Sequence, residues 1–343
     1  MEKRYFVGIF VVAFVFLLGV GTLIVVIDPF FHYHKPLKAL SYRIYKERYQ
    51  NDGIIKHFDY DAIITGTSTS ENFKTSEMDR LFNTNAVKIP FAGAGLKEIH
   101  DTVQRAIQSN PDLKIIVWGL DYHMLFKRKD YARYDHFPIY LYDNNLWNDI
   151  EYVLNGEVFL RSIRDVIYYT IKGGHTTSFD DYSNWNAQFK FGKEAVIPDP
   201  DKSRFLISKT ETPNFESIEE NILNLVIQNP QIDFYFFWAP YNIAFFDAYH
   251  DKALTDFFIG ERETLEMILP YDNVHFFSFF DDFDVITNFD NFKDVLHYHE
   301  KINSHMLECM AKGVHQVTLD NYDAYCQRVW DFYTTYDYDA IYK

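Results

Sequence analysis

The chain has 343 residues, of which 48% are hydrophobic and 24% charged, and its formal net charge is -16. This is the composition of a folded globular protein, and the acidic balance excludes a nucleic-acid binder that neutralises phosphates with basic side chains. Two cysteines are too few for a disulfide-stapled fold, so the core must come from apolar residues, including the 19% that are aromatic.

The first thirty residues predict a membrane anchor. Residues 6–27 contain no charge, and at about 1.5 Å per residue a helix of that length crosses a hydrocarbon core of about 30 Å. Lys3 and Arg4 precede this run, which places the N-terminus in the cytoplasm and the remaining chain outside it. A cleaved signal peptide is the alternative, but no small-x-small cleavage pattern follows Ile27. We therefore expect a single-pass protein of the cell membrane, bound to lipid through this anchor, with an extracytoplasmic globular part.

Short apolar runs alternate with helical patterns after residue 57. Between the second and third runs, apolar residues at helical spacing predict a helix over 96–108, which Asn110 and Pro111 end. This rhythm predicts a three-layer α/β/α fold of the flavodoxin-like type, with a mostly parallel five-stranded sheet and a ligand site beyond the carboxyl ends of the strands. The expected strands are 62–65, 86–89, 113–118, 232–238 and 274–277.

The chain is expected to divide into four parts. Residues 1–30 are the anchor, 31–56 a juxtamembrane stalk or helix, 57–315 the α/β domain, and 316–343 a C-terminal extension packed on that domain. The interval 125–215 breaks the alternation and is rich in Tyr, Asp and Asn. It predicts an insertion that covers or shapes the site.

Neither a metal nor a cofactor is expected. The chain contains no HExxH, CxxC, Walker A or GxGxxG pattern. Cys309 and Cys326 would lie in a compartment where disulfides form, but two cysteines near the end of a chain can equally be unpaired core residues. Their pairing is left open.

Ser68 is the candidate nucleophile. It follows the first predicted strand and Gly66, and it precedes a predicted helix. Its hydroxyl would lie at the mouth of the sheet, with its backbone N–H free to stabilise an oxyanion. The pattern differs from the Gly-x-Ser-x-Gly elbow, because Ser70 stands at the second position after Ser68. A serine that merely caps the helix is the alternative interpretation.

A base and its carboxylate partner are predicted near the C-terminus. A serine hydroxyl needs a base to take its proton, and the base needs a carboxylate to fix its tautomer. Asp294 and His297 supply both within one turn of chain, before the predicted helical run 300–310. In isolation, such a pair favours the alternative interpretation, a loop with a solvated Asp and a His packed against the sheet.

Together these residues resemble the SGNH/GDSL hydrolase superfamily. The first block of that family matches Gly66-Thr67-Ser68, and its last block, Asp-x-x-His before the final helix, matches Asp294 and His297. Its oxyanion glycine resembles Gly93 after the second strand. The resemblance spans residues 61–310 and implies a Ser-His-Asp triad with the N–H groups of Ser68 and Gly93 in the oxyanion hole.

The third family block departs from the pattern. The family has Gly-x-Asn-Asp after the third strand, whereas this chain has Gly119-Leu120-Asp121-Tyr122. An Asn donates a hydrogen bond to an oxyanion, but an ionised Asp121 would repel it. Three explanations remain open: another residue completes the oxyanion hole, Asp121 has a different role, or the protein is only weakly active.

The combination of one span, an extracytoplasmic domain and a long insertion resembles accessory proteins of cell-surface acylation. Examples act in D-alanylation of lipoteichoic acid and O-acetylation of alginate, beside a membrane-bound O-acyltransferase. The resemblance implies an esterase or O-acyltransferase acting on a cell-surface polysaccharide or other glycopolymer, with such an acyltransferase as partner.

The alternative function is a catalytically silent scaffold of the same fold. It would bind a glycan or a membrane partner through the aromatic insertion. Tyr140, Tyr142, Trp147 and Trp185 are the candidate sugar platforms in that case, although aromatic residues in such a chain are more often part of the core.

Overall fold

The computed structural model describes residues 2–133, 137–199, 213–249 and 252–343. Its contacts divide the chain into two compact units. Unit 1 consists of Met1–Phe58 and Tyr134–Tyr182, and unit 2 of Asp59–Arg133 and Ser183–Lys343. The predicted insertion is therefore shared between the units, and its stretches 134–136 and 200–212 lie outside the described residues.

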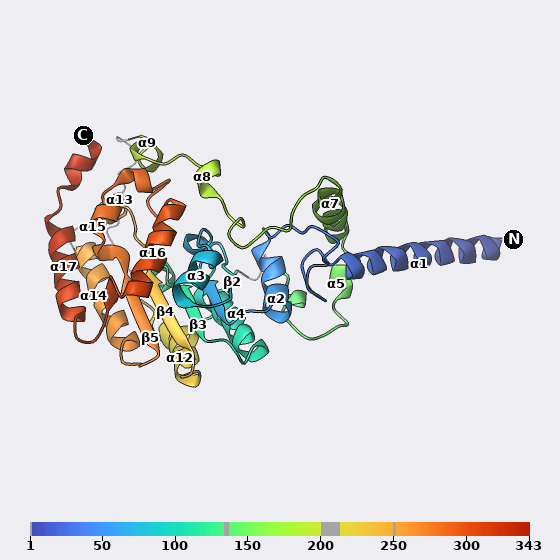
Figure 1. The fold of residues 1–343 in the computed structure, drawn as a ribbon, viewed down its shortest axis with the longest axis horizontal. Helices are drawn as coiled ribbons and strands as arrows, with labels where there is room; N and C mark the ends of the chain where they lie inside the picture. Colours follow the sequence, from blue (N-terminus) through green and yellow to red (C-terminus); the bar gives the residue numbers. More distant parts are fainter. Residues whose placement is uncertain (1, 134–136, 200–212, 250–251) are drawn as a thin grey trace. The chain divides into compact units, whose positions relative to one another are not determined.

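Unit 2 is built on one six-stranded sheet with the order β2-β1-β3-β4-β5-β6 (Figure 1). Neighbouring strands are parallel except for β6, which pairs antiparallel with β5. The α/β class and the mostly parallel sheet are thus confirmed, but the predicted number of five strands is wrong. The sixth has two residues, too few to show a periodic pattern. The strands are β1 Ala62–Thr65, β2 Ala86–Lys88, β3 Ile115–Gly119, β4 Asp233–Trp238, β5 Val274–Ser278 and β6 Gln316–Val317.

Helices pack around this sheet through apolar faces. In α4 (Leu96–Ser109), Ile99, Val103 and Ala106 are buried on one face, as the sequence predicts. The other long helices are α3 Thr75–Phe82, α14 Lys252–Ile268, α16 Glu300–Lys312 and α17 Tyr322–Thr335. Among these, α3 packs beside α16 and α14 packs beside α17. The short helices are α8 Trp185–Gln188, α9 Lys193–Val196, α11 Phe215–Ile218, α12 Asn224–Gln228, α13 Ile243–Asp247 and α15 Phe283–Ile286.

Aromatic rings fill the core of unit 2. Trp238 at the end of β4 stacks on Phe280 with ring centroids 5.7 Å apart, and Phe276 on β5 meets the same indole edge-on at 4.7 Å. Phe283 and Phe332 stack at 3.8 Å between α15 and α17. The high aromatic content is thus used largely as interior bulk, which β-strands accommodate well.

Unit 1 combines the N-terminal helix with parts of the predicted stalk and insertion. Its helices are α1 Glu2–Ile27, α2 Glu47–His57, α5 Ile150–Val153, α6 Gly156–Arg161, the π-helix η5 Ser162–Tyr168 and α7 Tyr169–Ile171. The buried carboxylate of Asp28 accepts the backbone N–H groups of His32, Tyr33 and His34 at 2.7–3.0 Å, and the Tyr152 hydroxyl at 2.7 Å. These bonds fix the turn after α1 to a segment more than a hundred residues later in the chain.

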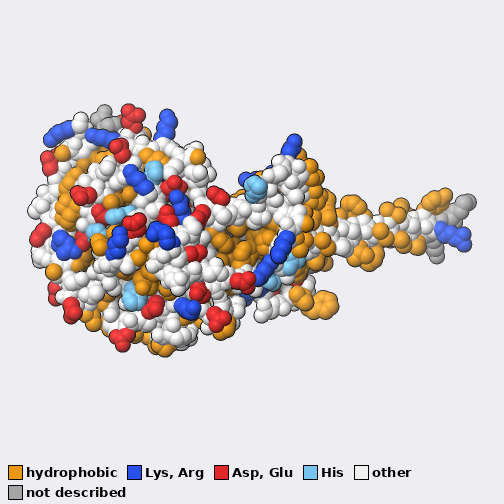
Figure 2. Space-filling view, viewed as in Figure 1, with side chains coloured by type: hydrophobic (Ala, Val, Ile, Leu, Met, Phe, Trp, Pro, Cys, Tyr) orange, Lys and Arg blue, Asp and Glu red, His pale blue; other side chains and the backbone are white. Residues whose placement is uncertain are grey.

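Helix α1 is long and apolar enough to cross a membrane. The stretch Arg4–Ile27 has a mean hydropathy of 3.0, and only 6% of its most apolar window is buried within the protein. Hydrophobic side chains cover the part of α1 that the rest of unit 1 leaves exposed (Figure 2). Length and composition therefore fit a membrane span.

Candidate active site

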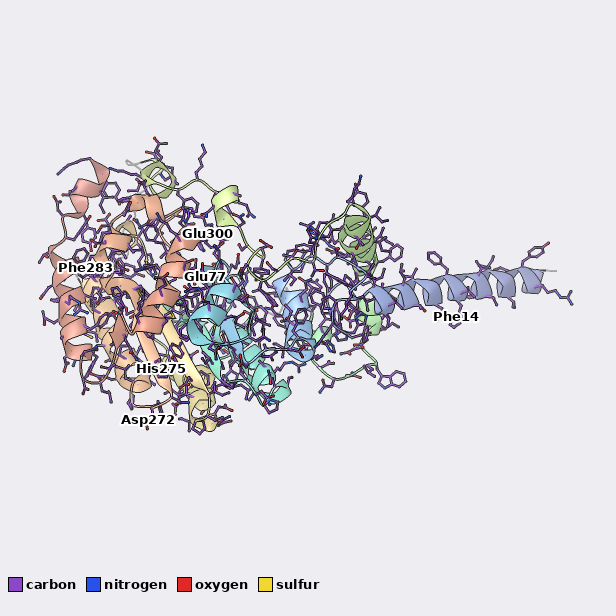
Figure 3. All side chains as sticks on the ribbon, in the orientation of Figure 1. Phe14, Glu77, Asp272, His275, Phe283 and Glu300 are labelled. Carbon is purple, nitrogen blue, oxygen red and sulfur yellow. The ribbon has the colours of Figure 1, made fainter. Side chains whose placement is uncertain are left out.

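The candidate site lies at the carboxyl ends of the parallel strands. His275 and Asp272 mark the amino end of β5, and Glu300 lies towards the opposite end of the sheet (Figure 3). Glu300 begins α16 directly after the loop that carries Asp294 and His297. The first and last sequence motifs therefore meet at the end of the sheet where parallel α/β folds bind ligands.

Gly66 produces the turn that presents Ser68. Its φ of 137° belongs to a conformation that only glycine adopts readily, and a Cβ here would stand 3.0 Å from the backbone oxygen of Gly119. The chain then forms the short 3-10 turn η1 (Ser68–Ser70), at whose first position the Ser68 N–H has no acceptor within the turn. The Ser70 hydroxyl instead donates to the Thr65 carbonyl at 3.0 Å and is fully buried. Ser68 is thus the serine that faces the site.

The structure brings Ser68, His297 and Asp294 together. Ser68 Oγ lies 2.9 Å from His297 Nε2, and His297 Nδ1 lies 2.9 Å from both carboxylate oxygens of Asp294. The imidazole therefore connects the hydroxyl to the carboxylate through its two nitrogens. This is the arrangement in which a histidine can take the proton of a serine while an aspartate fixes the tautomer.

Asp294 is held in its charged form by the loop itself. Burial raises the pKa of this carboxyl, but the hydrogen bond and charge of His297 outweigh burial, and the backbone N–H groups of Leu296 and His297 also donate to Asp294 Oδ1 at 2.9 Å. The pKa of Asp294 consequently lies below its usual value. The carboxylate stays ionised at neutral pH and remains the acceptor that His297 needs.

Gly93 lies in a loop tied to the Ser68 turn. The Phe91 N–H donates to the Gly66 carbonyl at 2.9 Å, so the loops after β2 and β1 run side by side. Gly93 has a φ of 65°, and a Cβ on it would stand 2.9 Å from Nη1 of Arg133. A guanidinium group thus lies against the glycine that the family resemblance implies for the oxyanion hole.

Asp121 lies beneath the Ser68 turn as a hydrogen-bond acceptor. Its side chain is 3% exposed. The Thr67 hydroxyl donates to Asp121 Oδ2, the Thr69 hydroxyl donates to Oδ1 at 3.2 Å, and the Tyr241 hydroxyl lies 3.5 Å from Oδ1. The two threonines that flank Ser68 are therefore both anchored on this carboxylate. In this arrangement Asp121 accepts hydrogen bonds and positions the turn, whereas an oxyanion hole needs donors.

Two side chains that sequence reasoning missed hold the same turn from the C-terminal side. The Tyr298 hydroxyl and the Asn303 amide both donate to the Thr69 carbonyl at 3.0 Å. Tyr298 directly follows His297, and Asn303 lies in the first half of α16. The base and the nucleophile are thereby linked through the backbone as well as through their side chains. The sequence contains no signal for either contact.

A small aromatic cage beside the triad was also missed. The indole of Trp185 on α8 meets the His297 ring edge-on at 5.2 Å. The Lys293 ammonium lies 4.4 Å from the Trp185 ring, 4.0 Å from the Phe189 ring and 3.8 Å from Asp294 Oδ2. A segment of the predicted insertion therefore contacts the base directly. Trp185 belongs to unit 2, whereas the other three aromatic residues considered as sugar platforms, Tyr140, Tyr142 and Trp147, belong to unit 1.

Comparison with known proteins adds little to this geometry. No family model matches the chain, and no curated protein matches it. A solved structure from Streptococcus pneumonia, provisionally assigned as a platelet activating factor, is similar with a TM-score of 0.37 and 12% identity, covering 77% of this chain and 90% of that chain. This likeness is too distant to indicate a shared fold or activity.

Proposed function

We propose that the chain is a membrane-anchored, extracytoplasmic serine esterase or O-acyltransferase of the SGNH type, acting on ester groups of cell-surface glycopolymers. The observation that carries the proposal is the hydrogen-bonded series Ser68 Oγ, His297 Nε2, His297 Nδ1 and Asp294, with a distance of 2.9 Å at each step. Gly66-Thr67-Ser68, Gly93 and the Asp294–His297 pair support the family assignment.

The proposed reaction begins with proton transfer. His297 takes the proton of the Ser68 hydroxyl as the oxygen attacks the ester carbonyl carbon, and Asp294 stabilises the imidazolium that forms. The N–H groups of Ser68 and Gly93 donate to the oxyanion. When the tetrahedral intermediate collapses, His297 returns the proton to the leaving alcohol, and the acyl group remains on Ser68. Water or a sugar hydroxyl, deprotonated by His297, then releases it.

The N-terminal helix supports a membrane location for this chemistry. Lys3 and Arg4 precede the uncharged residues 6–27, so by the positive-inside bias unit 2 would lie on the extracytoplasmic side. A short tether raises the effective concentration of a domain near a membrane-bound donor. A membrane-bound O-acyltransferase that supplies the acyl group is therefore the proposed partner, and a surface polysaccharide is the acceptor.

One observation favours a silent scaffold as the second candidate function. Asp121 occupies the position at which the family has an oxyanion-binding Asn, and here its carboxylate is occupied by the Thr67 and Thr69 hydroxyls. The scaffold would keep the fold and bind a glycan or a membrane partner without forming an acyl-enzyme.

Mass spectrometry of the full chain in detergent separates these functions. After brief exposure to a small activated acetate ester, the intact mass should increase by one acetyl group, and peptide mapping should place that group on Ser68. Addition of an oligosaccharide should move the acetyl group to sugar if the protein is a transferase. Rapid hydrolysis without acylated sugar would indicate an esterase, and absence of both acyl-enzyme and turnover would favour the scaffold.

A further inference from the structure

A second cluster of chemically competent side chains lies where β5, α16 and β6 meet. Asp282 follows β5 and the 3-10 turn η7 (Phe279–Asp281), His305 and Cys309 are on α16, and His315 lies between α16 and β6. His305 and Cys309 are four positions apart and therefore share one face of the helix. Neither Cys309 nor Cys326 forms a disulfide, so the Cys309 thiol is available as a ligand.

The donor atoms of His305, Cys309 and His315 gather closely, and Asp282 adjoins the two histidines. The ligand atoms of His305, Cys309 and His315 all lie within 4.8 Å of one another. Cys309 Sγ is 3.6 Å from His305 Nε2, while Asp282 Oδ2 is 2.8 Å from His305 Nε2 and 3.6 Å from His315 Nε2. Metal–ligand bonds of about 2.0–2.3 Å in a tetrahedral site separate the ligand atoms by about 3.4–3.6 Å. Two of the separations, Cys309 Sγ to His305 Nε2 and Asp282 Oδ2 to His315 Nε2, match this spacing at 3.6 Å, whereas Asp282 Oδ2 and His305 Nε2 lie closer, at a hydrogen-bond distance that a bound ion would have to widen.

His315 has the carboxylate partner that commonly orients a metal-binding histidine. His315 Nδ1 lies 2.7 Å from Asp281 Oδ1, and Asp281 is paired in turn with Arg328. A hydrogen bond from Nδ1–H to a carboxylate fixes the tautomer that leaves the Nε2 lone pair facing the cluster. The carboxylate–histidine pair that orients metal ligands in many proteins is therefore already in place.

The types of donor atom in the cluster indicate which metal ion it would bind. A thiolate, two imidazoles and a carboxylate form a mixed soft and borderline set that suits Zn²⁺ and does not suit Mg²⁺ or Ca²⁺, which prefer oxygen ligands. Cys309 is buried, whereas the His305 side chain is 42% exposed, which gives an ion a way in from the surface.

We infer that Asp282, His305, Cys309 and His315 bind one zinc ion, which joins α16 to the ends of β5 and β6. The cluster shares no residue with the Ser68 triad, but α16 also carries Asn303, whose amide donates to the Thr69 carbonyl beside Ser68. The ion would therefore act as a structural cross-link that steadies the helix supporting the nucleophile. This inference does not depend on the proposed esterase activity.

Cobalt substitution tests the site on the full chain in detergent. After chelator treatment, Co²⁺ should bind with one ion per chain and give the visible bands of a tetrahedral site together with a thiolate-to-cobalt charge-transfer band. Added Zn²⁺ should displace the cobalt and abolish both. Cys309→Ser should lose the charge-transfer band, and Cys326→Ser, which changes the other free thiol, should keep it.

Two further variants keep the test decisive if Cys309→Ser fails to fold. His305→Ala removes a ligand at a partly exposed position and should weaken Zn²⁺ binding by more than 100-fold with an unchanged far-UV spectrum. Asp281→Asn removes the orienting carboxylate and should weaken binding by about 10–100-fold. Absence of a charge-transfer band in the wild-type chain, retention of that band in Cys309→Ser, or unchanged Zn²⁺ affinity in His305→Ala would overturn the inference.

Discussion

Ser68 and Ser70 are two positions apart, but their hydroxyls have different partners. Ser68 Oγ faces His297, whereas Ser70 Oγ donates to a carbonyl at the end of β1. The sequence Thr-Ser-Thr-Ser does not distinguish them, since either serine could cap the following turn. The distinction arises from the Gly66 turn, which fixes the direction of each side chain.

Replacing each serine in turn gives a matched pair of variants. Ser68→Ala should reduce ester hydrolysis by about 10⁴-fold or more, because no oxygen remains to attack the substrate, and its thermal stability should not fall. Ser70→Ala should lower the free energy of unfolding by about 1 kcal/mol through the lost buried hydrogen bond and should keep most of the activity. Turnover of a chromogenic ester and thermal unfolding measure both. The reverse pattern would show that Ser70 is the nucleophile.

Glu261 on α14 makes stability depend on pH. It is fully buried, it accepts the Tyr325 hydroxyl at 2.5 Å, and burial raises its pKa from 4.5 to about 8. Between these values the folded protein keeps a proton that the unfolded chain has released. The stability associated with this proton is complete below the unfolded pKa and is lost as the pH rises towards about 8, by about 1.4 kcal/mol per pH unit.

Glu261→Gln should remove this dependence, because an amide does not ionise. The variant should unfold at a temperature close to that of the wild type at about pH 5 and at a higher temperature at about pH 9. Glu266→Gln, at a half-exposed position on the same helix, is the control and should show no such divergence. A constant difference between Glu261→Gln and wild type across this range would contradict the assignment.

The three residues proposed as a triad could be singled out in the sequence because each signal is local. Ser68 follows a strand and a glycine, and Asp294 and His297 lie within one turn of chain. Tyr298, Asn303 and the Asp121 network could not be predicted, because their partners are between 52 and 234 positions away along the chain. A single sequence does not report contacts at that separation.

At the scale of elements, the strands were predictable and the segments around the site were not. The first five strands are mostly apolar, as burial on both faces of a parallel sheet requires, with polar residues such as Lys88 and Asp233 at their ends. Strand β6 has two residues, and α8 has four, so neither is long enough to show a period. The contact of α8 with His297 depends on Trp185 and Lys293, whose pairing appears only in three dimensions.

Lys293 should link α8 to the loop that carries Asp294 and His297. Its ammonium lies over the rings of Trp185 and Phe189, and its side chain is only 14% exposed. Lys293→Met keeps most of the aliphatic length but removes the charge. It should lower the free energy of unfolding by about 1 kcal/mol and reduce kcat through a less constrained His297.

Urea unfolding and ester kinetics measure this effect. Lys312→Met provides the control, since Lys312 is exposed and forms an ion pair with Glu308 one turn away. Its effect on stability should be below about 0.5 kcal/mol, with no change in kcat. Equal effects of the two substitutions would show that the contacts of Lys293 with the rings contribute nothing.

The division into two units determines which truncated forms of the chain can be expected to fold. Unit 1 needs both of its segments, since Ile24 and Phe30 pack with Leu141, Tyr152 and Val158 in one cluster. A chain that simply begins at Arg48 would therefore leave the later segment without the residues that cover it. A soluble catalytic fragment has to omit both segments of unit 1.

A chain of 59–133 joined to 183–343 by a flexible Gly/Ser linker should be monomeric and cooperatively folded, and it should retain ester hydrolysis. The chain beginning at Arg48 should aggregate, because the apolar side chains of 137–182 are exposed. Gel filtration and thermal unfolding distinguish the two. Aggregation of the linked chain, or a well-behaved chain from Arg48, would show that the units are not independent.

The discontinuity of unit 1 has a consequence for biosynthesis. The ribosome completes Phe58 early, but Tyr182, which closes the unit, follows about 120 residues later, which is about 6–25 s at ordinary rates of translation. Until Tyr152 has been made, Asp28 lacks the hydroxyl that donates to it, and Phe30 packs on Tyr49 but lacks the contact with the Tyr152 ring. The first segment of unit 1 is thus synthesised early but reaches its final packing late. If α1 spans the membrane, it would hold this segment there until the second segment, which ends at Tyr182, has been synthesised.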